Sequence, residues 1–401
     1  MIDRHKDNLA PAGSRKVTLV VCGKFHYFNF VKHLYEGGWL GQFVYSHKLS
    51  SKRTLGPTGA VSNNLWLKEY LYQGHLRLLG QRGLGWAGNL YHEIWGWQLE
   101  HVMRPASLVH FLLHGHCLRA LRKASQRGEF LLADAVNSHP HDYFALINHE
   151  HESLGLPRLK SERACGQMLE ELSLSDGVLA PSKFVRDSYI RHGIDPARIA
   201  CIPFGVNLSV FVPALKPPPS PSRPFRVVCV AQVSPRKGHQ YLLQAWKQLA
   251  LPQAELHCYG IVDHLLLPVL QRIGAANVTF HGPVDRATIV AALQGSDVFV
   301  LPSVEEGMPY SILEAMACGL PVIATVNSGA EDLIVPGENG FIVPIRSPQA
   351  MAEKIEWCYR HRDAVLAMGA AARQRVELRY NRADFARNLM ALYDQCLASR
   401  G

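Results

Sequence analysis

The chain has 401 residues, a length that predicts two or three domains at about 150 residues per domain. Hydrophobic residues make up 48 % and charged residues 19 %, which excludes a disordered chain and a coiled coil. The net charge is +9, and residues 1–215, with 24 basic and 17 acidic residues, hold +7 of it. A surplus of positive charge in one half of the chain favours an anionic partner for that half, such as a phosphate, a nucleic acid or a membrane surface.

Nine cysteines occur without a Cys-x-x-Cys pair, so neither a disulfide framework nor a structural zinc site is expected. This usage favours a reducing compartment, and we expect a cytoplasmic protein. Residues 1–15 are polar, lack the apolar core of a signal peptide and are predicted to form a disordered tail. No run of about 18 uncharged apolar residues occurs, so no membrane-spanning helix is expected.

In the first half, short apolar runs predict strands that alternate with helices. A helix that ends at Gly37 and Gly38 is expected between the first two strands. An aromatic helical insert is expected at about 61–105, with Trp66, Trp86, Trp95 and Trp97. The expected strands are 16–23, 41–46, 129–139, 175–182 and 197–206.

The clearest boundary is a proline-rich stretch at 214–224, which predicts a semi-rigid extended linker. Beyond it, apolar strands and amphipathic helices alternate regularly, which is typical of a parallel sheet with both faces covered. The expected strands are 226–231, 255–261, 277–282, 297–303 and 321–325, and the expected helices are 239–250, a run that ends near 273, 286–293 and 308–319.

We therefore predict an α/β protein with two Rossmann-like, doubly wound domains that face a central cleft. The first spans 16–213 and the second 225–380, and we expect a C-terminal helix at 381–401 to pack back on the first domain. Ligands of such sheets bind at the carboxyl ends of the strands. Two facing sets of strand ends place the expected site in the cleft.

The segment 303–325 carries the strongest chemical signal. Glu306 and Glu314 are separated by seven residues, and Pro309 lies where a helix is expected to begin. Free amides around the start of that helix, at Gly307, Met308, Tyr310 and Ser311, suit an anion or sugar hydroxyls. Carboxylates beside such a site accept hydrogen bonds well from sugar and ribose hydroxyls.

This segment resembles the E-(seven residues)-E signature of family 4 glycosyltransferases, retaining enzymes of the GT-B fold. The stretches 180–213, 231–246 and 328–344 resemble other parts of the same family, in the right order and spacing. The resemblance implies a transferase that moves a sugar from a nucleotide diphosphate-sugar to an acceptor hydroxyl with retention of configuration. It also implies a substrate of the UDP or GDP type, with no further cofactor and no bound metal.

The resemblance assigns roles to individual residues. Arg236 and Lys237 look like the pair that neutralises the donor diphosphate, which agrees with two adjacent cations at a strand end. Glu314 resembles the residue that holds the ribose, and Glu306 the one that contacts the transferred sugar. The donor is therefore expected to contact Glu306, Gly307, Met308, Pro309, Tyr310, Ser311 and Glu314 as well as Arg236 and Lys237.

The first half departs more from the family pattern. Many members have a glycine pair in the first strand–helix loop, whereas this chain has only Gly23. Gly23 is expected to let the backbone approach the phosphates. The stretch 130–143 resembles the strand whose terminal histidine lies beside the donor sugar, which points to His139. Because this half holds 15 histidines, a structural role for His139 stays open.

Two further groups of histidines are considered as a metal site and as part of the acceptor side. The cluster His149–Glu152 lacks the H-E-x-x-H spacing of a zinc site, so no metal site is predicted. His110 and His114 are placed on one helical face and, with His116, are read as wall residues on the acceptor side.

The predicted activity is that of a glycosyltransferase in glycan, polysaccharide or glycolipid biosynthesis. The alternatives are a GT-B sugar-nucleotide epimerase and a non-catalytic nucleotide-sugar or carbohydrate-binding protein. A nucleic-acid partner is not expected, because no basic run or known binding module occurs. The basic first domain and its tryptophans suit a glycan or lipid-linked acceptor, and peripheral association with the inner face of a membrane is a further expectation.

Overall fold

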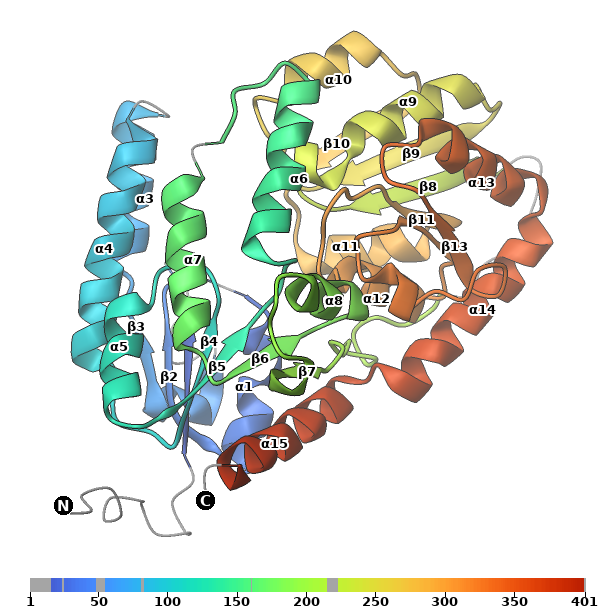
Figure 1. Ribbon diagram of the computed structural model, residues 1–401. Helices are drawn as coiled ribbons and strands as arrows, with labels where there is room; N and C mark the ends of the chain where they lie inside the picture. Colours follow the sequence, from blue (N-terminus) through green and yellow to red (C-terminus); the bar gives the residue numbers. More distant parts are fainter. Residues whose placement is uncertain are drawn as a thin grey trace, which may run out of the picture.

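The computed structural model describes residues 16–23, 25–47, 55–80, 83–159, 161–214 and 223–399. Two parallel sheets form two α/β domains that face each other, as the sequence predicts (Figure 1). The expected tail at 1–15 and most of the expected linker, residues 215–222, lie outside the described residues.

The first domain is built on a seven-stranded sheet in the order β3-β2-β1-β4-β5-β6-β7, with every pair parallel. Strand β1 is buried along its whole length, as expected for a sheet covered on both faces. The strands are β1 (Val17–Val21), β2 (Leu40–Tyr45), β3 (Ser62–Asn64), β4 (Leu108–Leu112), β5 (Phe130–Asp134), β6 (Gly177–Ala180) and β7 (Ile199–Cys201). The helices are α1 (Tyr27–Glu36), η1 (Gly56–Val61), α3 (Leu67–Leu79), α4 (Leu84–Val102), α5 (Leu118–Gln126), α6 (Pro140–Ser153), α7 (Glu162–Leu174), α8 (Lys183–Arg191) and η2 (Pro196–Arg198).

The second domain is built on a six-stranded parallel sheet in the order β10-β9-β8-β11-β12-β13. The strands are β8 (Phe225–Val230), β9 (Ala254–Tyr259), β10 (Val278–Gly282), β11 (Val298–Leu301), β12 (Val322–Thr325) and β13 (Gly340–Val343). The helices are η3 (Pro235–Lys237), α9 (His239–Leu249), α10 (Leu267–Ile273), α11 (Arg286–Gln294), α12 (Tyr310–Ala317), η4 (Ala330–Asp332), α13 (Pro348–Arg360) and α14 (Arg362–Arg379).

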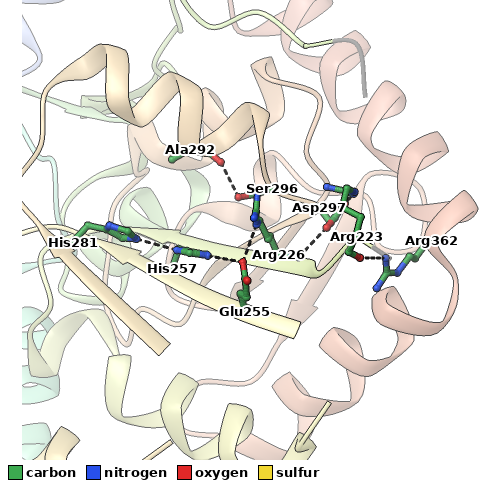
Figure 2. A network of polar contacts seen from close by, with 9 residues as sticks. All are labelled: Arg223, Arg226, Glu255, His257, His281, Ala292, Ser296, Asp297 and Arg362. Atoms are coloured by element: carbon green, nitrogen blue, oxygen red, sulfur yellow. Dashed lines mark hydrogen bonds and ion pairs between the residues drawn. The ribbon is translucent and has the colours of Figure 1, made fainter. Parts of the chain in front are cut away.

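A polar network crosses three strands of the second sheet (Figure 2). Arg226 on β8 donates to Glu255 on β9 (2.8 Å), which also lies 3.2 Å from His257. The other ring nitrogen of His257 lies 2.9 Å from His281 on β10. Because both ring nitrogens of His257 are used within this network, we infer that the network stabilises the pairing of the three strands and is not a ligand site.

The chain returns to the first domain at its last helix, α15 (Arg382–Ala398). Figure 1 shows α15 beside α1, whereas α14 packs against α12 and α13 of the second domain. The Phe385 ring lies 5.3 Å from that of Phe30, and the Tyr393 hydroxyl lies 2.7 Å from Nδ1 of His110. The first domain therefore contains core residues from both ends of the described chain.

The aromatic insert folds as a helical hairpin of α3 and α4 that packs beside α5 (Figure 1). Trp95 is fully buried, whereas Trp66 and Trp97 are 51 % and 54 % exposed. The side chain of Trp86 is outside the description. No helix in the described part of the chain is long and apolar enough to cross a membrane.

Two sequence interpretations are corrected by the fold. The expected strand 129–139 ends at Asp134, because the chain turns there and His139 becomes the N-cap of α6, with Pro140 in its first turn. His110 lies in strand β4 and not on a helix. The short apolar runs of β4, β13 and the three-residue β3 were not recognised as strands, because runs of that length carry little periodicity.

Candidate active site

Three charged side chains meet between the carboxyl ends of β8 and β11. Arg236 and Lys237 lie in η3, which follows β8, and Glu306 lies in the loop after β11. Arg236 Nη1 donates to Glu306 Oε2 over 3.0 Å, and Lys237 Nζ contacts the same oxygen. The structure thus brings these three residues together at the strand ends, where ligands of parallel sheets bind.

Gly238 makes this meeting possible. Its φ is +70°, and a Cβ there would lie 1.9 Å from the carbonyl oxygen of Pro302, just after β11. Only glycine combines that left-handed conformation with so close an approach of two backbones. The short helix η3 is therefore pressed against the loop that carries Glu306.

Glu305 was not singled out in the sequence, yet it fastens this loop to the first domain. It is fully buried and accepts from the backbone N–H of Ser138 (2.9 Å) and from the Ser138 hydroxyl (3.0 Å). Arg236 also donates to the Glu305 carbonyl over 2.9 Å. Nothing in the sequence distinguishes the two adjacent glutamates, because only the packed domains show which one points across the interface.

Burial and the neighbouring Arg236 guanidinium lower the pKa of Lys237 well below its ordinary value, although Glu305 opposes the shift. A cation in such surroundings is stabilised by any additional negative charge. Here the Glu306 carboxylate supplies one through its contact with Lys237 Nζ.

A cavity of about 540 Å³ opens between the domains at Glu314. Burial raises the pKa of the Glu314 carboxyl to about 7, while Arg286 and Arg382 oppose the shift. The lining residues come from the first loop and α1, from the start of η1, from the segment after β7, and from α11, α12 and α15. They are Phe25, His26, Phe28, Asn29, Leu55, Val206, Asn207, Phe211, Arg286, Tyr310, Glu314 and Arg382.

The turn before α12 contacts both the cavity and the first domain. Tyr310 lines the cavity, and Pro309 is the N-cap of α12. Met308 is buried in the core, and the Gly307 carbonyl accepts from the Ser182 hydroxyl of the first domain (2.6 Å). Ser311 is half-buried in the first turn of α12. The turn therefore joins the two domains as well as bordering the cavity.

Gly23 follows β1 in the first loop of the first domain, with φ +125°, a conformation that favours glycine. His26, also in this loop, lines the cavity and lies 2.8 Å from Asp134, a fully buried carboxylate at the end of β5. His110 lies 3.5 Å from the same oxygen, and His26 and His110 hold the pKa of Asp134 below its ordinary range against the effect of burial. The sequence suggests Lys24 and His26 as residues that face the cleft; Lys24 lies outside the described residues, and His26 lines the cavity. Its pairing with Asp134 was not predicted, because the two residues are far apart along the chain.

His139 is the N-cap of α6, and its backbone N–H donates to the Ser188 hydroxyl over 2.9 Å. Its ring stacks on His192, with centroids 4.0 Å apart, and lines a different cavity of about 370 Å³. Burial and His192 lower the pKa of His139 to about 4. Its neighbour Ser138, rather than His139 itself, contacts the loop of Glu305 and Glu306.

Helix α6 directs the side chains of the His149–Glu152 cluster to different partners. Glu150 is fully buried and faces the second domain, the His151 ring contacts the Pro157 carbonyl (2.7 Å), and Glu152 pairs with Arg158 (3.6 Å). Within the described ranges, no group of three or more histidine, cysteine, aspartate or glutamate side chains could hold a metal ion.

The fold is that of the GT-B glycosyltransferases, as comparison with solved structures shows. Sucrose-phosphate synthase from Thermosynechococcus elongatus superposes with a TM-score of 0.68 at 20 % identity, over 96 % of this chain and 100 % of that one. Anabaena Alr3699/HepE in complex with UDP-glucose gives 0.65 at 17 % identity, over 95 % and 99 %.

Residues 214–375 match the family described as "Glycosyl transferases group 1", so the chain contains a domain of that family. A curated relative is the putative colanic acid biosynthesis glycosyltransferase WcaL of Salmonella typhimurium (strain LT2), 29 % identical over 213 residues. The match covers 50 % of this chain and 52 % of WcaL, so the chain spans about half the length of this relative.

Proposed function

We propose that this protein is a retaining glycosyltransferase that moves a sugar from a nucleoside diphosphate sugar to an acceptor hydroxyl. The observation that carries the proposal is the meeting of Arg236, Lys237 and Glu306 at the strand ends between two facing domains. The family of the second domain and a neighbour solved with UDP-glucose support a donor of this class.

In this proposal, the donor diphosphate takes the place beside Lys237 and Arg236 that Glu306 now fills. The two cations then stabilise the negative charge that grows on the leaving diphosphate. Glu306, released from Lys237, is free to accept from a hydroxyl of the transferred sugar. Because these side chains supply the positive charge, we propose that no bound metal is needed.

Glu314 and the cavity around it form the proposed nucleoside side of the site. A carboxylate accepts from both hydroxyls of a ribose, and a cavity of about 540 Å³ lies within the usual range of ligand sites. The nine free cysteines suit a reducing compartment, so we propose that the reaction takes place in the cytoplasm. Exposed Trp66 and Trp97 support a peripheral contact of the first domain with a membrane or glycan.

The proposal is tested by thermal unfolding in the presence of UDP-, GDP- and ADP-sugars. A donor at about 100 times its Kd stabilises the folded state by about 2.7 kcal/mol, which raises Tm by roughly 5 °C. We expect one donor class to do so. If none of the three raises Tm, the proposed function is wrong.

Lys237→Ala is expected to lower the rate of donor cleavage on the order of 100-fold, as loss of one group that stabilises transition-state charge does. Release of free nucleoside diphosphate measures the rate. The matched control is Lys247→Ala on the exposed side of α9, where the ammonium donates to the Ile273 carbonyl. Equal rates for Lys237→Ala and the control would refute the assignment of the diphosphate site.

A further inference from the structure

A second cavity between the domains, of about 430 Å³, shares no lining residue with the one at Glu314. Helix α6 contributes four residues spaced so that they fall on one face, and α8 contributes two more. The second domain contributes one residue after β12 and one after β13. The lining is Asp142, Ala145, Leu146, His149, Phe184, Arg191, Asn327 and Arg346.

The backbone is unusual where the second domain forms this wall. Asn327 and Arg346 both have positive φ, +67° and +57°, a conformation that is uncommon outside glycine. Both follow the carboxyl ends of neighbouring parallel strands. Strained residues of this kind concentrate at ligand sites, and here two of them line one cavity.

This cavity adjoins the proposed site of sugar transfer. The Glu306 N–H donates to the carbonyl of Asn327 over 2.9 Å, so the loop proposed to contact the transferred sugar is bonded directly to the cavity wall. A ligand in the cavity would therefore reach the reacting sugar from the side of the first domain.

Two guanidinium groups determine the chemistry of the cavity. Arg191 is fixed by Asp142 over 3.0 Å but keeps 58 % of its side chain exposed. Arg346 pairs with Glu150 through Nε, while its Nη2 nitrogen is buried and has no hydrogen-bond partner in the described part of the chain. The rest of the Arg346 side chain, 28 % exposed, lines the cavity and brings its positive charge there.

The carboxylates nearby are already occupied. Glu150 is fully buried and accepts from Gln240 (3.1 Å) and Tyr241 (2.7 Å) as well as Arg346. Asp142 lies 2.7 Å from His192 and also pairs with Arg191. The cationic groups of the lining are the two arginines, beside the polar side chains of His149 and Asn327. Planar guanidinium groups match carboxylate and phosphate oxygens.

We propose that this cavity binds the acceptor and that the bound part of the acceptor carries an anionic group. The role of this ligand as acceptor rests on the proposed function, whereas the binding of an anion in the cavity does not. Arg191 and Arg346 bind the anion, and Phe184 and Leu146 form the apolar wall for the sugar ring or chain. The +7 charge of residues 1–215 attracts the same class of ligand at long range.

Two sources of the anion are distinguished by the probes. D-glucuronate and D-glucose differ only in the carboxylate and test an acidic sugar, whereas farnesyl diphosphate tests the diphosphate of a lipid carrier. Titrations are made with UDP or GDP at saturation, so that the diphosphate site at Lys237 is filled. Either anionic probe binding at least tenfold more tightly than glucose supports the proposal, and equal binding of all three overturns it.

Variants locate the binding. Arg191→Gln, at a largely exposed side chain, is expected to weaken the favoured anionic probe at least fivefold, and Arg346→Gln is expected to do the same. Ala145→Trp fills the cavity from the exposed face of α6 and is expected to abolish binding. The control Arg360→Gln, at the exposed last residue of α13, should bind as the unchanged protein does.

The Tm shift by UDP or GDP is recorded in every variant. If the shift is present and Arg191→Gln and Ala145→Trp both bind the anion normally, this inference fails while the proposed function stands. If no nucleotide shifts Tm, the proposed function fails, and the titrations without nucleotide still decide whether the cavity binds anions.

Discussion

At the scale of single residues, the positive pair at Arg236 and Lys237 is compensated by Glu306. Two largely buried cations without a compensating charge would destabilise the folded protein. In the absence of donor, Glu306 compensates the two positive charges. When a diphosphate binds, it has to displace only the Glu306 side chain from them. In the proposed reaction, the same residue then gains a second use at the transferred sugar.

Glu314 gives a prediction that depends on pH. Burial raises the pKa of its carboxyl from 4.5 to about 7, so the folded state keeps a proton that the unfolded state has lost. The free energy of unfolding should therefore decrease as pH rises from about 5 to 7, by an amount on the order of 2–3 kcal/mol at most.

Glu314→Gln is expected to remove this part of the pH dependence and to raise Tm at pH 8, while it weakens nucleotide binding. Thermal unfolding between pH 5 and 8 measures the first effect and the Tm shift by nucleotide the second. Glu338→Gln, at an exposed loop position, is the control. Identical pH profiles for the two variants would contradict the prediction.

At the scale of elements, α15 provides the joint between the domains. Phe385 is 3 % exposed and packs between Phe30 of α1 and Phe204, at ring distances of 5.3 and 5.8 Å. Helix α15 packs in the core of the first domain, and the chain enters it directly from α14 of the second domain. It therefore holds the two sheets at a set distance. Arg382, at its start, reaches the cavity of Glu314.

Phe385→Ala is expected to destabilise the protein by about 3–5 kcal/mol, the usual cost of deleting a buried phenylalanine ring. Urea unfolding followed by circular dichroism measures the change, and limited proteolysis should show earlier cleavage at α15. Leu378→Ala, whose side chain is 72 % exposed on α14, is the control and should change stability little. If α15 is as resistant to proteolysis in Phe385→Ala as in the control, α15 does not depend on Phe385 for its packing between the domains.

The elements also show what the sequence could and could not predict. Strands such as β8 and β12 were predicted because each holds a run of at least three consecutive apolar residues that a helical pattern follows along the chain. The strand β4 was missed because its run is only five residues long and contains His110, whose burial depends on its contacts with Asp134 and Tyr393. Partners from distant segments leave no local pattern, which is also why Glu305, Arg382 and the cavity of Arg191 were not foreseen.

At the scale of the whole molecule, the domains meet closely at the loop after β11. A Cβ on Gly307 would lie 2.0 Å from the carbonyl oxygen of Val136 in the first domain. The hydrogen bonds from Ser138 to Glu305 and from Ser182 to Gly307 close the same contact. The closed arrangement therefore depends on the absence of one methyl group.

Gly307→Ala is expected to hold the domains apart while each sheet stays folded. Small-angle scattering should give a larger radius of gyration than for the unchanged protein, and donor cleavage should fall because Glu305 loses its partner Ser138 across the interface. Gly166→Ala, on the exposed side of α7 with open space around it, is the control. An unchanged radius of gyration with normal activity would show that the interface tolerates the methyl group.

The return of α15 to the first domain also affects how the protein is made. Residues 385–393 complete a core that begins at Val17, so the first sheet leaves the ribosome long before its last packing partners exist. During synthesis, domains ordinarily fold in order from the N-terminus. Here the second domain can finish first, and the earlier sheet keeps an apolar face uncovered until the final helix arrives. Chaperone dependence of the nascent chain should therefore last until translation has passed α15.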